Sequence, residues 1–216
     1  MNGDVHMCVG AATATGMALL IPQMTVGDKE TVILGVGTAI IGSLLPDIDA
    51  NGESKIKKQF RKFMLFLVIA LTASVIYGVQ SGTLSNMLQR ASGSKTVFGF
   101  ILCIVLCIVG YRQPHRGFTH QLVGLLAFTF SWLLMFGYPM TYWFFFGYLS
   151  HQLVDFLNRR PIQWLYPLPG KVMLGVCYAD SAMAKAIGFV SLVLAFFFTM
   201  LLLNVNPDAI VQMVSK

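Results

Sequence analysis

Long apolar segments separated by short polar stretches run along almost the whole chain. This pattern predicts seven helices, at about residues 6–20, 31–45, 63–80, 96–111, 120–137, 141–157 and 186–203. Charge-poor runs of this kind are typical of membrane spans, although several are shorter than the ~20 residues of a full crossing. We therefore expect an all-α, polytopic membrane helix bundle in which some helices are short or partly re-entrant. Residues 1–216 are expected to form a single integral-membrane domain.

Proline and small residues refine the picture of the first two helices. Pro22 and Pro46 follow them directly, and proline does not continue a helix. In the first helix Gly10, Ala14 and Ala18 recur at every fourth position. Small residues at this spacing allow neighbouring helices in a membrane to approach closely. The first helix is therefore expected to pack tightly inside the bundle.

Composition supports a membrane protein and excludes several other classes. Hydrophobic residues make up 56% of the chain and charged residues 11%, whereas about a quarter of a soluble domain is charged. The mean hydropathy is +0.71. The alternative, a soluble protein with a very large core, would need more charge to cover its surface. We expect the cell (inner) membrane as its location and the lipid bilayer as its main partner.

The net charge of +6 comes largely from the predicted loops. Basic residues beside apolar segments set membrane orientation and contact anionic lipid head groups, so no nucleic-acid partner is expected. Eleven of the fifteen Lys and Arg residues lie in loops 47–62, 112–119 and 158–185, and three lie in 23–30, 81–95 and 138–140. The positive-inside rule places the first set of loops, and with it the N-terminus, in the cytoplasm.

Histidines and aspartates gather at the predicted cytoplasmic ends of these helices. Ionisable groups in membrane segments are costly and usually functional. We therefore predict that the fold brings them together to bind metal. The seven candidate ligands are His6, Asp47, Asp49, His115, His120, His151 and Asp155. Asp180 is a further acidic candidate.

Local spacing supports a shared site but also allows simpler readings. His151 and Asp155 are four residues apart and would share one helix face. Asp47 and Asp49 would point the same way in an extended segment. The alternative for His151 and Asp155 is a structural Asp–His pair that closes the bundle. The alternative for Asp47 and Asp49 is a polar turn that ends a helix.

The polar stretch between the fourth and fifth helices contains several distinct chemical groups. His115 is expected on the loop, Thr119 as the cap of the fifth helix, and His120 as its first residue. Gly117 suits a tight turn. The planar guanidinium of Arg116 suits phosphate or carboxylate rather than metal.

Imidazole and carboxylate ligands without thiolates suit zinc, with manganese as the alternative. Seven candidates exceed one tetrahedral site, so we expect one to three ions. The four cysteines are expected to be free thiols rather than disulfides or a thiolate zinc site. A metal of this kind activates water and neutralises a phosphoryl group. In such a reaction Arg116 would hold a phosphate oxygen, and Asp49 or Asp155 would accept a proton.

Three motifs in this order resemble the YdjM-like family of membrane-bound, predicted metal-dependent hydrolases. They are Leu44-Leu45-Pro46-Asp47-Ile48-Asp49, His115-Arg116-Gly117-Phe118-Thr119-His120 and Gly147-Tyr148-Leu149-Ser150-His151-Gln152-Leu153-Val154-Asp155. The likeness runs from His6 to about Pro167. By position it implies as ligands His6, Asp47, His115 or His120, His151 and Asp155. The order of these residues is also similar to that of zinc-dependent phospholipases C and P1-type nucleases, which implies a phosphoester substrate.

The leading hypothesis is a metal-dependent hydrolase that cleaves a lipid or lipid-linked phosphoester at the cytoplasmic membrane face. One alternative is a transporter or channel that uses the same residues as an ion pathway. A second alternative is a non-catalytic scaffold in which metal only ties the helices together. A serine hydrolase is disfavoured, because Ser150 lies in no G-x-S-x-G elbow.

Overall fold

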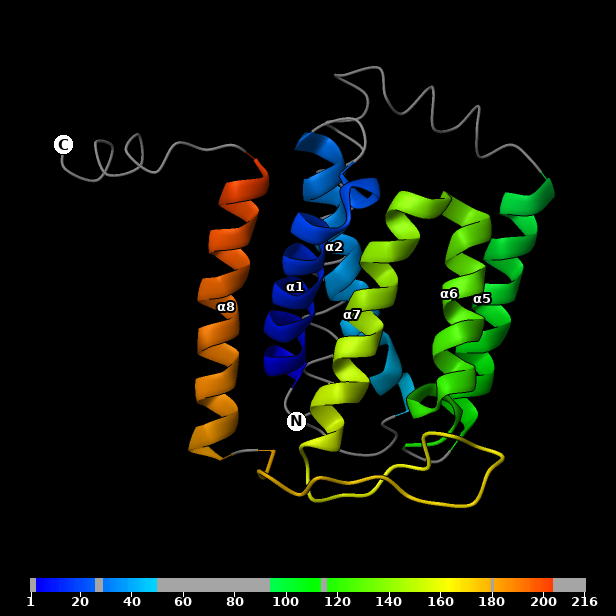
Figure 1. The fold of residues 1–216 in the computed structure, drawn as a ribbon. Coiled ribbons are helices and arrows are strands. Elements are labelled where there is room, and N and C mark those ends of the chain that lie inside the picture. The colour runs from blue at the N-terminus through cyan, green and yellow to red at the C-terminus, as the bar shows by residue number, and fades with distance from the viewer. Residues whose placement is uncertain (1–2, 26–28, 50–93, 114–115, 180, 204–216) are drawn as a thin grey trace.

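Six α-helices make up most of the computed structural model, which describes residues 3–25, 29–49, 94–113, 116–179 and 181–203 (Figure 1). The all-helical class is confirmed, and six predicted helices are present with both ends within four residues of the predicted positions. The seventh, expected at 63–80, lies outside the described residues. The helices are α1 (Gly3–Leu20), α2 (Lys29–Leu44), α5 (Ser94–Arg112), α6 (Leu122–Phe136), α7 (Tyr138–Phe156) and α8 (Ala182–Leu202).

Three segments of the described chain are long and apolar enough to cross a membrane: Lys29–Asp49, Ser94–Arg112 and Ala182–Leu202. Helix α6 is apolar but shorter. The number of seven spans and the cytoplasmic N-terminus remain predictions.

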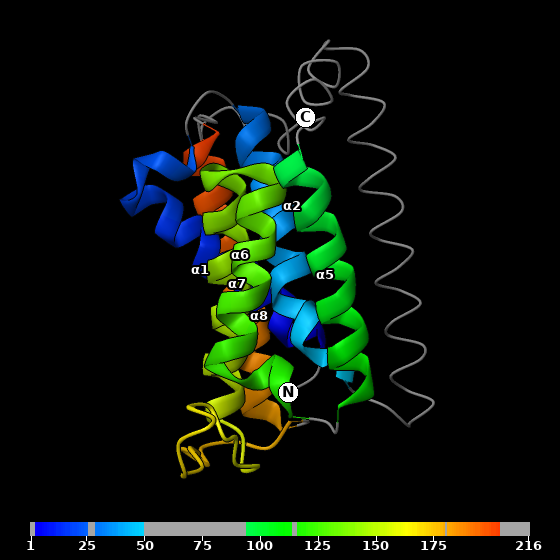
Figure 2. The same cartoon turned by 90° about the vertical axis from the view of Figure 1, so that its right-hand side faces the viewer.

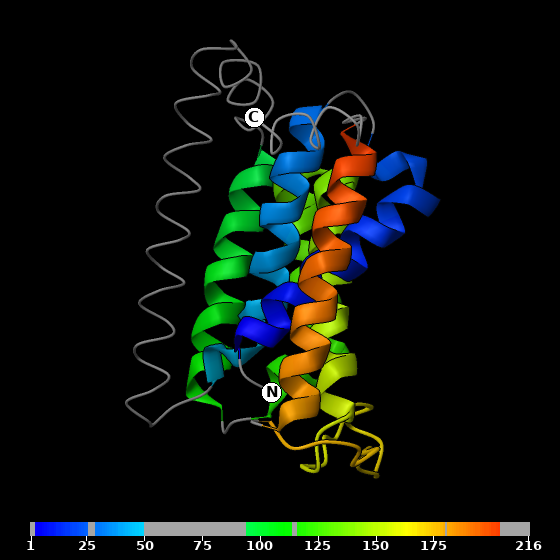
Figure 3. The ribbon, with the colours of Figure 1, turned by 90° about the vertical axis from the view of Figure 1, so that its left-hand side faces the viewer.

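Helices α2 and α7 lie side by side in the middle of the bundle, with α1 and α8 on one flank and α5 and α6 on the other (Figures 1, 2 and 3). Helices α2, α5 and α7 end where α1, α6 and α8 begin (Figure 1). We call this the polar end of the bundle. The alternating direction gathers groups that are far apart in the sequence at this one end.

The backbones of α2 and α7 approach so closely that only glycine fits between them. A Cβ atom on Gly147 would collide with the backbone of Ala39, and one on Gly42 would collide with the carbonyl oxygen of Phe144. Helix α1 joins the same packing, because a Cβ atom on Gly10 would lie 2.5 Å from Cβ of Ser43. Close packing through small residues is the expected device of membrane helices. It fixes the position of α7 relative to its neighbours.

An aromatic cluster holds α6 against α7. Phe128, Phe144 and Tyr148 are fully buried, and Trp132 stacks on Phe144 with ring centroids 4.4 Å apart. The Tyr148 hydroxyl donates a 2.6 Å hydrogen bond to the carbonyl oxygen of Thr119. Because the hydroxyl has a hydrogen-bond partner, its burial in the apolar cluster costs little free energy. This bond attaches the segment before α6 to the polar end of α7.

Two short 3-10 helices complete the polar end. The first, η2 (Leu45–Asp49), follows α2 directly, and the second, η3 (Phe118–His120), precedes α6. The α7–α8 loop, residues 157–179, then crosses this end of the molecule (Figure 1). Its backbone pairs with itself through a bridge between Ile162 and Val172. The loop therefore has a defined shape although it contains no helix.

Candidate metal centre

Six of the seven predicted ligands meet at the polar end of the bundle. They come from α1, η2, η3 and α7, four segments separated by up to 149 positions in the sequence. Five are buried, and the Asp47 side chain is 32% exposed. The six are His6, Asp47, Asp49, His120, His151 and Asp155. The seventh, His115, lies outside the described residues, as does Asp180.

Two imidazole nitrogens form the centre of the group. The Nε2 atoms of His120 and His151 are 3.3 Å apart, and each lies 3.8 Å from Oδ1 of Asp47. Oδ2 of Asp155 lies 3.5 Å from the first nitrogen and 3.9 Å from the second. Ligand atoms about 2.0–2.1 Å from a tetrahedral zinc ion are about 3.3–3.4 Å from one another. His120, His151 and Asp47 can thus supply three ligand atoms to one small divalent cation, and Asp155 lies beside both imidazoles.

Hydrogen bonds on the far side of each ring leave these Nε2 atoms suitable for a cation. Nδ1 of His151 lies 2.7 Å from the carbonyl oxygen of Ser43, which can only accept, so Nδ1 carries the proton. Nδ1 of His120 lies 3.2 Å from the Asp49 carboxylate. Metal-binding histidines are commonly oriented by such a carbonyl or carboxylate. The fixed tautomer directs the lone pair of each Nε2 toward the cluster.

Asp49 lies behind His120 rather than among the atoms that surround the candidate cation position. Its Oδ2 accepts 2.9 Å hydrogen bonds from the backbone N–H of Arg116 and from the Thr119 hydroxyl, in addition to facing His120. The side chain is fully buried. This geometry favours a positioning role over the predicted roles of ligand and proton acceptor.

The backbone of this region differs from the prediction in its details. Asp47 and Asp49 lie in a 3-10 helix, not in an extended segment, and they face opposite edges of the His120 ring. Thr119 does not cap α6, since its hydroxyl binds Asp49. His120 ends η3 instead of beginning α6. The positive φ angle belongs to Arg116 (68°), and not to Gly117.

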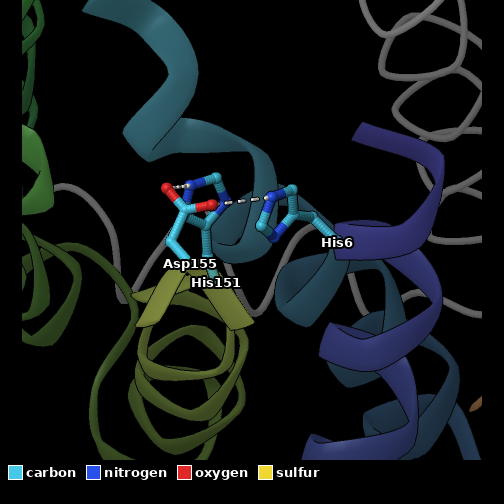
Figure 4. A group of neighbouring side chains, drawn as sticks. All are labelled: His6, His151 and Asp155. Carbon is cyan, nitrogen blue, oxygen red and sulfur yellow. Dashed lines mark ion pairs between the residues drawn. The ribbon is translucent and has the colours of Figure 1, made fainter. Parts of the chain in front are cut away.

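His6 approaches the cluster from the other flank (Figure 4). Its Nε2 lies 3.5 Å from Oδ1 of Asp155, and its ring stacks on His151 with centroids 3.8 Å apart. The predicted shared face of His151 and Asp155 is confirmed. His6, His151 and Asp155 form one possible ligand triad, and Asp47, His120 and His151 form another. Because only Nε2 of His151 is available to both, the geometry favours a single ion.

The family of the protein follows from a match over nearly its whole length. The family model of the YdjM inner membrane protein matches residues 1–210. The chain belongs to this family. It is accordingly an inner membrane protein, in agreement with its apolar helices. No curated protein and no solved structure matches the chain significantly, and the likeness to phospholipases C and P1-type nucleases stays a prediction.

In this YdjM-family protein the charge around the cluster favours a cation. Burial alone would lower the pKa of His120. The hydrogen bond that His120 donates to Asp49 and the negative charges of Asp49, Asp47 and Asp155 outweigh burial, so the pKa is raised above its ordinary value. The same negative charges would also attract a divalent ion, and the ion would compete with a proton for His120.

Two positioning groups could not be read from the sequence of this family member. The carbonyl oxygen that orients His151 belongs to Ser43, and a backbone carbonyl leaves no signature because every residue has one. Tyr148, which holds the Thr119 carbonyl, did carry a signal as a hydroxyl in an apolar helix one turn before His151. Only the structure shows that Tyr148 is buried and that its hydroxyl positions the Thr119 carbonyl oxygen.

Replacing Asp49 with alanine tests its positioning role. We expect the affinity for zinc to fall about 10–100-fold, the usual effect of removing the partner of a metal-binding histidine. Competition with a chromophoric chelator measures the affinity, with His120→Ala as the reference for a lost ligand. Unchanged affinity would refute the positioning role, and a loss as complete as that of His120→Ala would make Asp49 a ligand.

Proposed function

We propose that the protein is a membrane-bound, metal-dependent hydrolase that cleaves the phosphoester of a lipid or lipid-linked molecule at the cytoplasmic membrane face. Two imidazole nitrogens 3.3 Å apart, each within 3.9 Å of an Asp47 oxygen and an Asp155 oxygen, carry this proposal. All four come from fixed positions at the polar end of the bundle. Asp47, the most exposed of the six clustered residues, marks the side from which a substrate would reach them.

His120, His151, Asp47 and Asp155 would hold the ion. Zinc suits this mixture of nitrogen and oxygen ligands best, and manganese is the alternative. When bound, such an ion supplies a Lewis acid that polarises a phosphoryl oxygen and lowers the pKa of water. The remaining residues would bind the phosphate and move protons.

Arg116 is placed to bind the phosphate group. Its Nη2 lies 3.5 Å from Oδ2 of Asp155, and its Nη1 donates to the carbonyl oxygen of Arg160. The side chain is 11% exposed, and its Nε is buried without a hydrogen-bond partner in the described part of the chain. A guanidinium with donors to spare beside a metal centre suits a phosphate oxygen.

For the proton acceptor, the geometry leads us to place Asp155 ahead of Asp49 in this proposal. Asp49 already accepts two hydrogen bonds and faces His120, so its charge is committed to positioning. Oδ1 of Asp155 instead faces His6, whose other nitrogen, Nδ1, is buried and has no partner within the described residues. A proton taken up by Asp155 can be passed to His6, and from there toward the leaving group.

The purified full-length protein provides the test. We expect it to contain stoichiometric zinc or manganese and to release phosphorylated head group from phospholipid vesicles. A chelator should abolish the release, and the metal should restore it. His151→Ala should lose both metal and activity, because it removes the nitrogen shared by both triads.

Ser150→Ala is the matched control, because among the described residues the adjacent Ser150 hydroxyl bonds only to the carbonyl oxygen of Gly147 in its own helix. It should retain both properties. Folded, metal-free protein with full activity would refute the proposal. Bound metal without hydrolysis of any phosphoester would instead support the scaffold alternative.

A further inference from the structure

The α7–α8 loop exposes large apolar side chains to an unusual degree. The exposed fraction of six of them runs from 49% for Met173 to 66% for Leu174. Many exposed large apolar side chains on one short loop indicate an interaction site or contact with a membrane. The six residues are Tyr166, Leu168, Met173, Leu174, Val176 and Tyr178.

Hydrogen bonds hold the loop so that these side chains cannot turn inward. The Leu174 N–H donates a 2.7 Å bond to the carbonyl oxygen of Phe156, the last residue of α7. The Trp164 indole donates to Gln152 in α7, and the Trp164 carbonyl oxygen accepts from the N–H of Leu122 in α6. The apolar surface is therefore built into the fold.

The charge of the loop selects the partner. Residues 157–181 contain three basic residues, Arg159, Arg160 and Lys171, against one acidic residue, Asp180, and all three basic residues are exposed. Tyrosine and tryptophan are enriched where a protein meets the membrane–water interface, and basic residues bind anionic head groups there. A soluble acidic protein would satisfy the charge but would leave no reason for six outward apolar side chains on a segment joined directly to helix α8.

We infer that the α7–α8 loop lies in the head-group region of an anionic phospholipid leaflet. Its apolar side chains enter the upper acyl region, and its basic side chains contact lipid phosphates. This interface function is independent of the proposed hydrolase activity. The position of the loop also sets the depth of the candidate metal centre. The carbonyl oxygen of Phe156 accepts a hydrogen bond from the Leu174 N–H, and Phe156 directly follows Asp155. The centre then lies at the level of the lipid phosphates.

Nitroxide labels at single cysteines test the depth. The four native cysteines are replaced by alanine in the full-length chain, and one label is placed at Leu174→Cys, Lys171→Cys or Val190→Cys. Val190, 55% exposed on α8, is the reference for a lipid-facing position. Power-saturation EPR in phosphatidylcholine–phosphatidylglycerol vesicles then compares collisions with oxygen and with a water-soluble nickel complex. Circular dichroism and thermal unfolding verify that each variant is folded.

The label at position 174 is expected to collide severalfold more with oxygen than with the nickel complex, as at position 190. The label at position 171 should show the reverse. Similar nickel accessibility at 171 and 174 would place the loop in water and overturn the inference. Shielding from both reagents, with spin–spin broadening, would assign the surface to a second copy of the chain and would also overturn it.

Discussion

Replacing Asp155 with alanine is expected to destabilise the folded protein by about 3–5 kcal/mol and to abolish metal binding. This is the usual cost of removing one member of a buried charged network while its partners stay. Asp155 contacts His6 through Oδ1, and Arg116 and both cation-facing imidazoles through Oδ2. Its loss leaves the guanidinium of Arg116 without the carboxylate that balances its charge.

Asp155→Asn separates the effect of losing the negative charge from the effect of losing the side-chain volume. Asparagine fills nearly the same space and keeps one oxygen, so the packing of α7 against α1 should survive while the negative charge is lost. We expect Asp155→Asn to lose most of its zinc but a smaller part of its stability. Thermal unfolding in detergent and metal analysis measure the two effects. If Asp155→Ala kept wild-type stability and metal content, the carboxylate would contribute to neither, and the prediction would be wrong.

Replacing Gly147 with alanine is expected to cost about 3 kcal/mol or more, although the change adds a single methyl group. Overpacking a tight interface usually costs about 1–3 kcal/mol, and a collision with backbone that has no rotamer to adopt lies at the upper end. The added Cβ would meet the carbonyl group of Ala39. Relief requires α7 to move away from α2, which separates His151 from Ser43. Metal affinity should therefore fall as well.

Gly37→Ala is the matched control for Gly147→Ala. Gly37 lies in the middle of α2, and a Cβ atom there would have no neighbour within 4 Å among the described residues. Alanine at this position should raise the stability by about 0.5–1 kcal/mol, because it restricts the unfolded chain. Unfolding curves and zinc titrations compare the stability and the zinc affinity of the two variants. Equal behaviour of the two would contradict a close α2–α7 contact.

The sequence predicted the helices and the gathering of polar groups well, for identifiable reasons. Apolar runs between polar turns determine where helices form, and antiparallel neighbours bring alternate loops to one end. His6 and Asp155 could thus be predicted to meet although 149 positions separate them. The helical spacing of His151 and Asp155 gave their shared face directly.

The roles of individual groups within the centre depended on distances that spacing does not determine. Nothing in the sequence separates Asp47, which faces Nε2 of His120, from Asp49, which faces Nδ1. The two aspartates differ only in which edge of one ring they reach. Thr119 was similarly ambiguous, because a threonine before a helix is a good cap but also a good donor to a buried carboxylate.

The order of the ligands along the chain has a consequence for biosynthesis. His6 is made first, and His151 and Asp155 are made last, after α2, α5 and α6 have entered the membrane. The proposed ion could therefore not be captured during insertion of the first helices, and a chain that stops before α7 would lack His151 and Asp155. For an ion bound as proposed, metal content would therefore report completed assembly of the bundle, and metal supply would act on the last step of maturation.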